Sequence, residues 1–116
     1  MEEIRIKMTP AFEKLSHKLI LPEILNDLLN TLESNPTKGT IIPGTGGIRK
    51  LRWITGKNNK GKSGGVRVLY HYSKNILILL ITLYGKNQKD NISQSEKNEL
   101  KRTIPQLVAK YMEDIE

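Results

Sequence analysis

The apolar stretch at residues 76–83 constrains the fold more than any other part of this sequence. It reads ILILLITL, and Thr82 is its one polar residue. Successive side chains of a strand point to opposite faces of a sheet, so a strand of this composition is buried on both sides. The stretch is far shorter than the roughly 20 residues that a membrane-spanning helix needs. It therefore predicts a central strand, with helices packed over at least one face of its sheet.

The segments around this strand predict an α+β domain. Residues 3–8 alternate isoleucine with charged side chains, which indicates an opening strand. Thr9-Pro10 and Pro22 each begin a predicted helix, and Ser93-Gln94-Ser95-Glu96 is a capping box that opens a third. Two further strands are predicted at residues 48–55 and 65–73, before the apolar strand at 75–84. Short connections between these three strands favour antiparallel pairing.

The expected architecture is one domain over residues 1–116. It has a mostly antiparallel sheet of about four strands, two N-terminal helices and a C-terminal helix, with the helices on one face of the sheet. The glycine-rich segment 39–47 is predicted to be a loop. Pro105 is expected to kink or split the C-terminal helix, because proline lacks the backbone N–H that a helix interior uses.

Charge is segregated along the chain, and the segregation indicates a polyanionic partner. The net charge is +7, yet no Asp or Glu occurs between Glu33 and Asp90. Lysines and arginines are frequent in that interval. A concentrated positive field of this kind binds nucleic acid by releasing counterions. A generally basic solvated surface and a site for an anionic peptide are the alternatives.

Composition removes several classes of chemistry. The chain has no cysteine, which excludes disulfides, thiolate metal sites and cysteine nucleophiles and fits a reducing cytoplasm. Magnesium sites require carboxylates, and the basic segment offers only Asp90, so we expect no metal. No cofactor is predicted either. The N-terminus Met-Glu-Glu lacks the features of a signal peptide, so we expect a cytoplasmic protein without membrane contact.

One motif suggests a nucleotide site and is rejected. The stretch GKNNKGKS at residues 56–63 matches the P-loop pattern letter for letter. A P-loop lies between a strand and a helix, whereas here Gly64-Gly65 and a β-branched strand follow. What remains is a cationic loop between two strands. Its lysines, Lys57, Lys60 and Lys62, are candidates for gripping phosphates.

The side chains of the predicted sheet suit a ribonuclease that works without metal. In such an enzyme the 2′-hydroxyl of RNA attacks the adjacent phosphate, while protein groups stabilise charge and transfer protons. Alternation along residues 66–72 places Arg67 and His71 on one face. Tyr84 and Lys86 share a face at the end of the last strand. Arg67, Tyr84 and Lys86, with Lys50 or Arg52, are predicted to form one patch.

Three other residues receive more modest roles. The ordinary pKa of histidine, ~6.5, makes His71 an obvious general base. A lone histidine on a strand is more often structural, however, so we assign no catalytic role to His71. We predict RNA binding for it instead. Trp53 is assigned to the core, with stacking on a base as the alternative. His17 is assigned to structure.

Three blocks in this order resemble the HigB-type branch of the RelE/ParE toxin superfamily. They are IPGTGGIRKLRW at residues 42–53, GKSGGVRVLYHY at 61–72 and YGKNQKDNIS at 84–93. The similarity covers residues 35–104. No block is specific for the family alone, but the three blocks in this order are. It implies a RelE-like microbial RNase-type fold. The family's basic position falls on Arg67, and its Tyr-x-Lys block falls on Tyr84 and Lys86. His71 and Tyr72 differ from the aromatics usual there, so no catalytic role is transferred to His71.

The resemblance implies a type II toxin that cleaves mRNA in the ribosomal A site and is neutralised by a cognate antitoxin protein, through which it contacts operator DNA. Combined with the residue patterns, it predicts a ribosome-dependent, metal-independent mRNA endoribonuclease. Arg67, Tyr84 and Lys86 are its expected catalytic residues. Its expected RNA-binding residues are Lys50, Arg52, Lys57, Lys60, Lys62 and His71. Two alternatives stay open: a ParE-like poison that binds gyrase without cleaving RNA, and a non-catalytic RNA-binding module.

Overall fold

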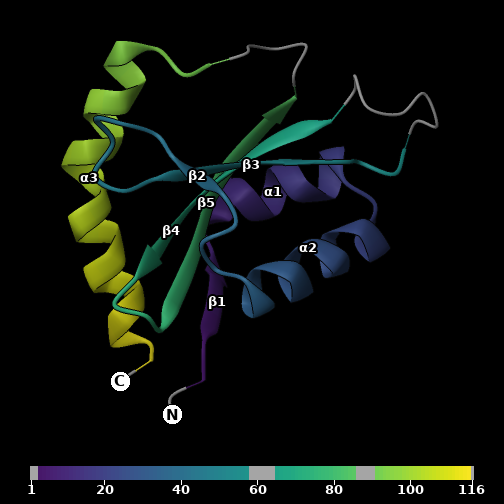
Figure 1. The fold of residues 1–116 in the computed structure, drawn as a ribbon, viewed down its shortest axis with the longest axis horizontal. Coiled ribbons are helices and arrows are strands. Elements are labelled where there is room, and N and C mark those ends of the chain that lie inside the picture. The colour runs from purple at the N-terminus through teal and green to yellow at the C-terminus, as the bar shows by residue number, and fades with distance from the viewer. Residues whose placement is uncertain (1–2, 58–64, 86–90, 116) are drawn as a thin grey trace.

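The computed structural model describes residues 3–57, 65–85 and 91–115, and it shows strands and helices in the predicted order (Figure 1). The N-terminal part consists of β1 (Arg5–Met8), α1 (Pro10–Leu19) and α2 (Pro22–Ser34). The strands β2 (Thr40–Ile41), β3 (Arg49–Trp53), β4 (Val66–Ser73) and β5 (Leu77–Gly85) follow, and α3 (Gln94–Glu113) comes last. The predicted α+β class is confirmed.

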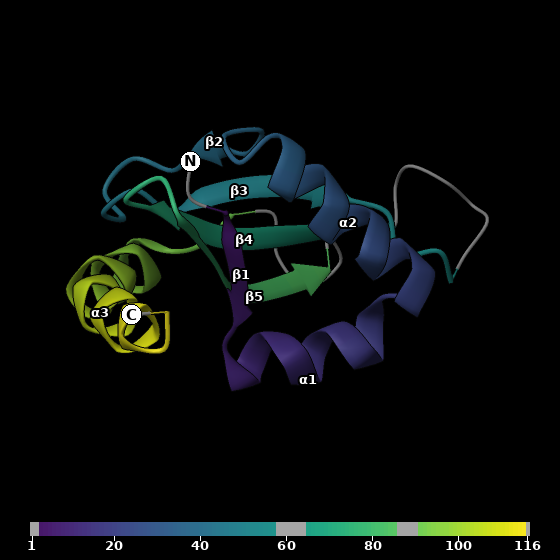
Figure 2. The same ribbon diagram turned by 90° about the horizontal axis from the view of Figure 1, so that it is seen from below.

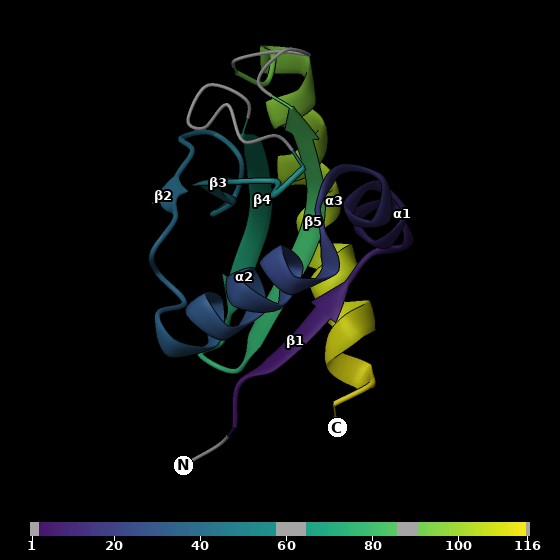
Figure 3. The same cartoon turned by 90° about the vertical axis from the view of Figure 1, so that its right-hand side faces the viewer.

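The strands form one five-stranded sheet in the order β1-β5-β4-β3-β2. All neighbours are antiparallel except β1, which runs parallel to β5 along the edge seen in Figure 3. The fifth strand is β2, which lies in the segment predicted to be a loop. Its two residues, Thr40 and Ile41, pair with β3. A strand this short has no detectable alternation, which is why the pattern of residues 39–47 did not indicate it.

Helices cover both faces of the sheet, so the expectation that they lie on one face was wrong. Figure 2 shows α3 on one side and α1 and α2 on the other. One buried cluster joins Phe12 of α1 and Leu28 of α2 to the sheet, and a second joins Ile104 of α3 to the opposite face. The strand β5 contributes side chains to both clusters. The strand β5 is therefore apolar on both faces because a layer of helices covers each of them.

The helix α3 is not split at Pro105, contrary to the second possibility raised by the sequence. One helix of 20 residues runs through this position. Pro105 is exposed, whereas Ile104 beside it is 3% exposed and packs on the sheet. Proline has no N–H to donate to the carbonyl oxygen of Lys101, four residues earlier, and the helix continues without that hydrogen bond. Ser93 and Glu96 form the predicted capping box at the start of α3.

A β-bulge interrupts the pairing of β4 with β5. Leu69 pairs with Thr82, but the next residue, Tyr70, pairs with Leu80. Ile81 is thus the extra residue of β5. Such a bulge shifts the alternation of side chains by one residue. Side chains after the bulge therefore point to the opposite face from the one that uninterrupted alternation would give. Among the described residues, no helix is long and apolar enough to cross a membrane.

Candidate active site

Three predicted residues form a row across the sheet. Arg52 of β3 pairs with Arg67 of β4, and Arg67 in turn pairs with Tyr84 of β5. Residues that pair directly across neighbouring strands have their side chains on the same face, with Cβ atoms about 4.5–5.5 Å apart. The structure therefore brings together Arg52, Arg67 and Tyr84. We call this set the cross-strand row.

Lys50 lies in the next row on the same face. It pairs with Leu69, which pairs with Thr82. The Lys50 ammonium donates a hydrogen bond to the side-chain oxygen of Asn91, 3.3 Å away, just before α3 begins. Thr82 is half-buried beside the cross-strand row. Sequence reasoning did not single out Thr82, because it was seen only as the polar exception in an apolar strand.

Burial increases along the cross-strand row from one end to the other. Arg52 is exposed, Arg67 is 8% exposed and Tyr84 is 6% exposed. Tyr84 belongs to the buried cluster on the α3 face together with Ile81 and Ile92. A large aromatic side chain packed in this way has few orientations available. The tyrosine is thus held firmly while Arg52 can move in solvent.

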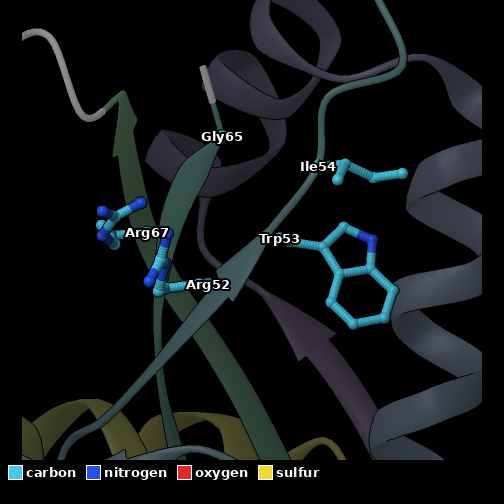
Figure 4. A pocket seen from close by; sticks show the side chains of 5 residues that line it. All are labelled: Arg52, Trp53, Ile54, Gly65 and Arg67. Carbon is cyan, nitrogen blue, oxygen red and sulfur yellow. The ribbon is translucent and has the colours of Figure 1, made fainter. Parts of the chain in front are cut away.

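A pocket of about 420 Å³ adjoins the two arginines. Arg52, Trp53, Ile54, Gly65 and Arg67 line it (Figure 4). In this view Arg52 and Arg67 extend side by side, while Trp53 points toward α2. The volume lies within the range of about 300–1,000 Å³ typical of small-molecule pockets. Arg67 therefore borders open space although most of its surface is covered.

Among the described residues, no carboxylate balances the charges of the cross-strand row. Within the described part of the chain, neither Arg52 nor Arg67 forms an ion pair with a carboxylate; the ion pair found there joins Arg102 to Glu99 on α3. Like charges that face each other on neighbouring strands repel. An anion between the two guanidinium groups would remove that repulsion and accept their hydrogen bonds. The arrangement is chemically suited to a phosphate.

The remaining predicted lysines do not add to the row among the described residues. The ammonium of Lys57 donates a hydrogen bond to the carbonyl oxygen of Lys18, in the last turn of α1. A cation at that position satisfies a free helix carbonyl and complements the helix dipole. Lys60, Lys62 and Lys86, which were predicted to bind RNA or take part in catalysis, lie outside the described residues, as does most of the P-loop-like stretch.

His71 faces the same side as Arg67 but lies four positions further along β4, a rise of about 13 Å. Its Nδ1 lies 2.5 Å from the Ser73 hydroxyl and its Nε2 lies 3.2 Å from the Gly46 carbonyl oxygen. A carbonyl only accepts, so Nε2 carries the proton and donates to Gly46, while Nδ1 accepts from Ser73.

Burial lowers the pKa of His71 below its ordinary value; the hydrogen bond to Gly46 opposes this shift, and the positive charge of Arg49 adds to it. The structure does not bring His71 into the cross-strand row.

Trp53 lies against the cluster formed with α1 and α2, as assigned from the sequence. Its indole N–H donates a hydrogen bond to the carbonyl oxygen of Ile24, 3.2 Å away. The neighbouring Ile54 is 55% exposed at the pocket, which the sequence did not indicate. A large exposed aliphatic side chain next to two arginines offers an apolar surface beside a charged one.

Comparison with known families decides the relationship. Residues 4–116 match the family described as the RelE toxin of the RelE / RelB toxin-antitoxin system. This chain belongs to the RelE toxin family. The match covers nearly the whole sequence and includes every element described above.

Membership of the RelE family agrees with the α+β fold and with the resemblance seen in the three sequence blocks. It connects this chain to a toxin–antitoxin system. Within this RelE-family chain, the cross-strand row is the place where two predicted catalytic residues, Arg67 and Tyr84, meet the predicted RNA-binding residue Arg52. Among the described residues, no three His, Cys, Asp or Glu side chains gather to hold a metal ion.

Proposed function

We propose that this protein is the toxin of a type II toxin–antitoxin pair, of the HigB type, and that it cleaves mRNA on the ribosome without a metal ion. The observation that supports this most directly is the pairing of Arg52 with Arg67 across β3 and β4, beside Tyr84 and without a carboxylate among the described residues. A site of two unbalanced guanidinium groups and a phenol is suited to a phosphodiester.

In the proposed reaction, the RNA supplies its own nucleophile. A base removes the proton of the 2′-hydroxyl, the 2′-oxygen attacks the adjacent phosphorus, and the bond to the 5′-oxygen breaks as that oxygen receives a proton. The products are a 2′,3′-cyclic phosphate and a 5′-hydroxyl. Negative charge grows on the phosphate oxygens in the transition state, where fixed hydrogen-bond donors have their largest effect on rate.

The residues receive distinct roles in this proposal. Arg67, which borders the pocket yet is 8% exposed, stabilises the phosphate in the transition state. A guanidinium can donate two parallel hydrogen bonds to phosphate, which a lysine cannot. Tyr84 assists proton transfer from its fixed position, and Lys86 follows it two positions later in the sequence. Arg52 and Lys50 bind the RNA backbone on the exposed side.

The experiment that tests the proposal is the mapping of new 5′ ends on a defined mRNA in a reconstituted translation system. Wild type is compared with Arg67→Ala, Arg67→Lys and Arg102→Ala, each with and without ribosomes. Arg102→Ala is a suitable control because it removes the same charge elsewhere on the protein. Arg102 is an exposed residue of α3, with 69% of its side chain accessible, and it pairs with Glu99.

The expected result is cleavage at codon-related positions by wild type and Arg102→Ala only when ribosomes are present. Arg67→Ala should cleave about 10²–10³-fold more slowly than wild type, and Arg67→Lys should also be weak. Intact mRNA with folded wild-type protein would refute the nuclease and favour the gyrase poison or the simple RNA-binding module. Cleavage by Arg67→Ala at the wild-type rate would refute the assignment of the site.

A further inference from the structure

Thr9 lies at the point where the sheet, the helix α1 and the bulge of β5 meet. The parallel pairing of β1 with β5 ends at Met8 and Leu80. Thr9 follows, and its backbone N–H donates to the carbonyl oxygen of Leu80 at 3.0 Å. Its hydroxyl donates to the carbonyl oxygen of Ile81 at 2.6 Å. Ile81 is the extra residue of the bulge.

The same hydroxyl also begins α1. It accepts a hydrogen bond from the backbone N–H of Phe12 at 3.1 Å, and Thr9 is the N-cap of the helix. Thr9 is 7% exposed, so both hydrogen bonds are shielded from water. A hydroxyl has one proton to donate and lone pairs to accept with, and here it uses both capacities. One side chain therefore ties the start of α1 to the bulge.

The bulge decides which face of the sheet Tyr84 occupies. Before it, Leu77, Leu79 and Ile81 belong to the cluster on the α3 face. Unbroken alternation would give Leu83 to that face and Tyr84 to the face of α1 and α2. The structure has the reverse: Tyr84 packs in the α3-face cluster and Leu83 in the other. The shift is what places Tyr84 beside Arg67.

We propose that Thr9 is a positioning residue of the active site: its hydroxyl holds the bulge at Ile81 that turns Tyr84 onto the face of Arg67. This inference rests on the proposed function, in which Tyr84 and Arg67 act together. Thr9 itself lies at the opposite edge of β5 from β4 and acts through the backbone of β5. An isolated helix cap would have no effect of this kind on the site.

Three variants of the full chain test the inference. Thr9→Val has nearly the same shape as threonine but lacks the hydroxyl. Thr9→Ser keeps the hydroxyl and serves as the conservative rescue. Ser93→Ala is the matched control, because it removes the N-cap of α3, whose hydroxyl accepts from Glu96 at 3.1 Å, and leaves the bulge untouched.

Two measurements are made on each folded variant. The first is the kinetics of mRNA cleavage on ribosomes. For Thr9→Val we expect kcat to fall by about tenfold to a hundredfold with KM nearly unchanged, because small misplacements of catalytic groups have effects of that order. Thr9→Ser and Ser93→Ala should keep kcat within about twofold of wild type. A loss in Ser93→Ala as large as that in Thr9→Val would overturn the inference.

The second measurement does not depend on activity. NMR contacts from the Tyr84 ring to methyl groups of the α3-face cluster should be present in wild type, Thr9→Ser and Ser93→Ala and reduced in Thr9→Val. Retention of these contacts in Thr9→Val overturns the inference. If wild type cleaves no RNA, the proposed function fails, while these contacts still decide whether Thr9 places Tyr84.

Should Thr9→Val not fold, Thr9→Ser remains decisive. A folded Thr9→Ser protein that has lost the Tyr84 contacts overturns the inference, because serine keeps the hydroxyl. A folded Thr9→Ser protein with wild-type contacts, beside a Thr9→Val protein that cannot form the native sheet, supports it.

Discussion

The two ends of β4 present polar residues on the same face of the sheet, but the bonding partners of these residues differ. At its end, His71 has both ring nitrogens in hydrogen bonds, to Ser73 and to Gly46. Near its beginning, Arg67 has no carboxylate partner among the described residues and borders a pocket. A histidine is the more usual catalytic residue, yet here both of its ring nitrogens are already hydrogen-bonded, whereas the Arg67 guanidinium borders open space. The comparison shows that the environment of a side chain decides its role.

The helix α3 accounts for much of this difference. Near His71, the residues Ile104, Pro105 and Val108 of α3 face the end of β4 across a second pocket. The pocket beside Arg67 is lined by residues of β3, β4 and the segments next to them, and by no described residue of α3. The helix thus covers one end of the strand and leaves the other accessible to a ligand.

The largest expected effect is a difference in mRNA cleavage between variants at the two ends of β4. Arg67→Ala should lower kcat for mRNA cleavage by about 10²–10³-fold, the usual loss when one donor to a developing negative charge is removed. His71→Gln should stay within about threefold of wild type at neutral pH. Single-turnover cleavage assays measure both. Comparable losses in the two variants would show that the ends of β4 do not differ in function.

A second prediction concerns the stability provided by the end of β4. The Tyr70 hydroxyl accepts a hydrogen bond from the backbone N–H of Gly39 at 2.9 Å and donates one to the carbonyl oxygen of Pro36 at 2.7 Å. Tyr70→Phe leaves the buried Gly39 N–H and the partly buried Pro36 carbonyl without this partner and should lower the free energy of unfolding by about 1–3 kcal/mol. Urea denaturation measures it. An unchanged denaturation midpoint would mean that solvent replaces the phenol without cost.

The third prediction tests the exposed side of the site. Arg52→Ala should raise KM by about fivefold or less, because an exposed charge pair contributes about 1 kcal/mol or less. It should leave kcat nearly unchanged and reduce the salt dependence of RNA binding by about one counterion. Titrations at several salt concentrations measure the slope. A large fall in kcat would instead place Arg52 with Arg67 in the chemical step.

The smallest effect is a pH dependence at the His71 end. Burial lowers the pKa of His71 in the folded protein, so near and below pH ~6.5 the unfolded chain binds more protons than the folded one. The stability that the neutral ring contributes is complete above the unfolded pKa and is lost as the pH falls through the folded pKa. The free energy of unfolding should therefore decrease on acidification from about pH 7, and less steeply in His71→Gln. Denaturation curves between about pH 5 and 7.5 measure the difference, and equal slopes would contradict the assignment.

Much of the fold was predictable because its signals are local. Thr9 and Ser93 are helix caps, as their sequence context indicates. The faces of β4 followed from simple alternation, which correctly put Arg67 and His71 on one side. The position of α3 was not predictable in this way, since an amphipathic helix shows that it packs on something but not on which face of the sheet.

The candidate site was predicted in its residue types but not in its geometry. The pairing of Arg67 with Tyr84 depends on the bulge at Ile81, whereas Arg52 pairs with Arg67 in a regular ladder. A strand that is apolar on both faces looks the same whether or not its alternation shifts, so the bulge left no trace in the sequence. Lys57 was predicted from charge alone, and charge does not reveal that a helix carbonyl lies within reach.

The parallel pairing of β1 with β5 has a consequence for the time at which the protein becomes functional. Arg5 pairs with Leu77, and the Thr9 hydroxyl contacts Ile81, so these links join residues about 70 positions apart. Contacts of such high sequence separation close large loops and form late in folding. A growing chain therefore has α1 and α2 long before β5 is synthesised. The row of Arg52, Arg67 and Tyr84 is therefore completed only after β5 has been synthesised.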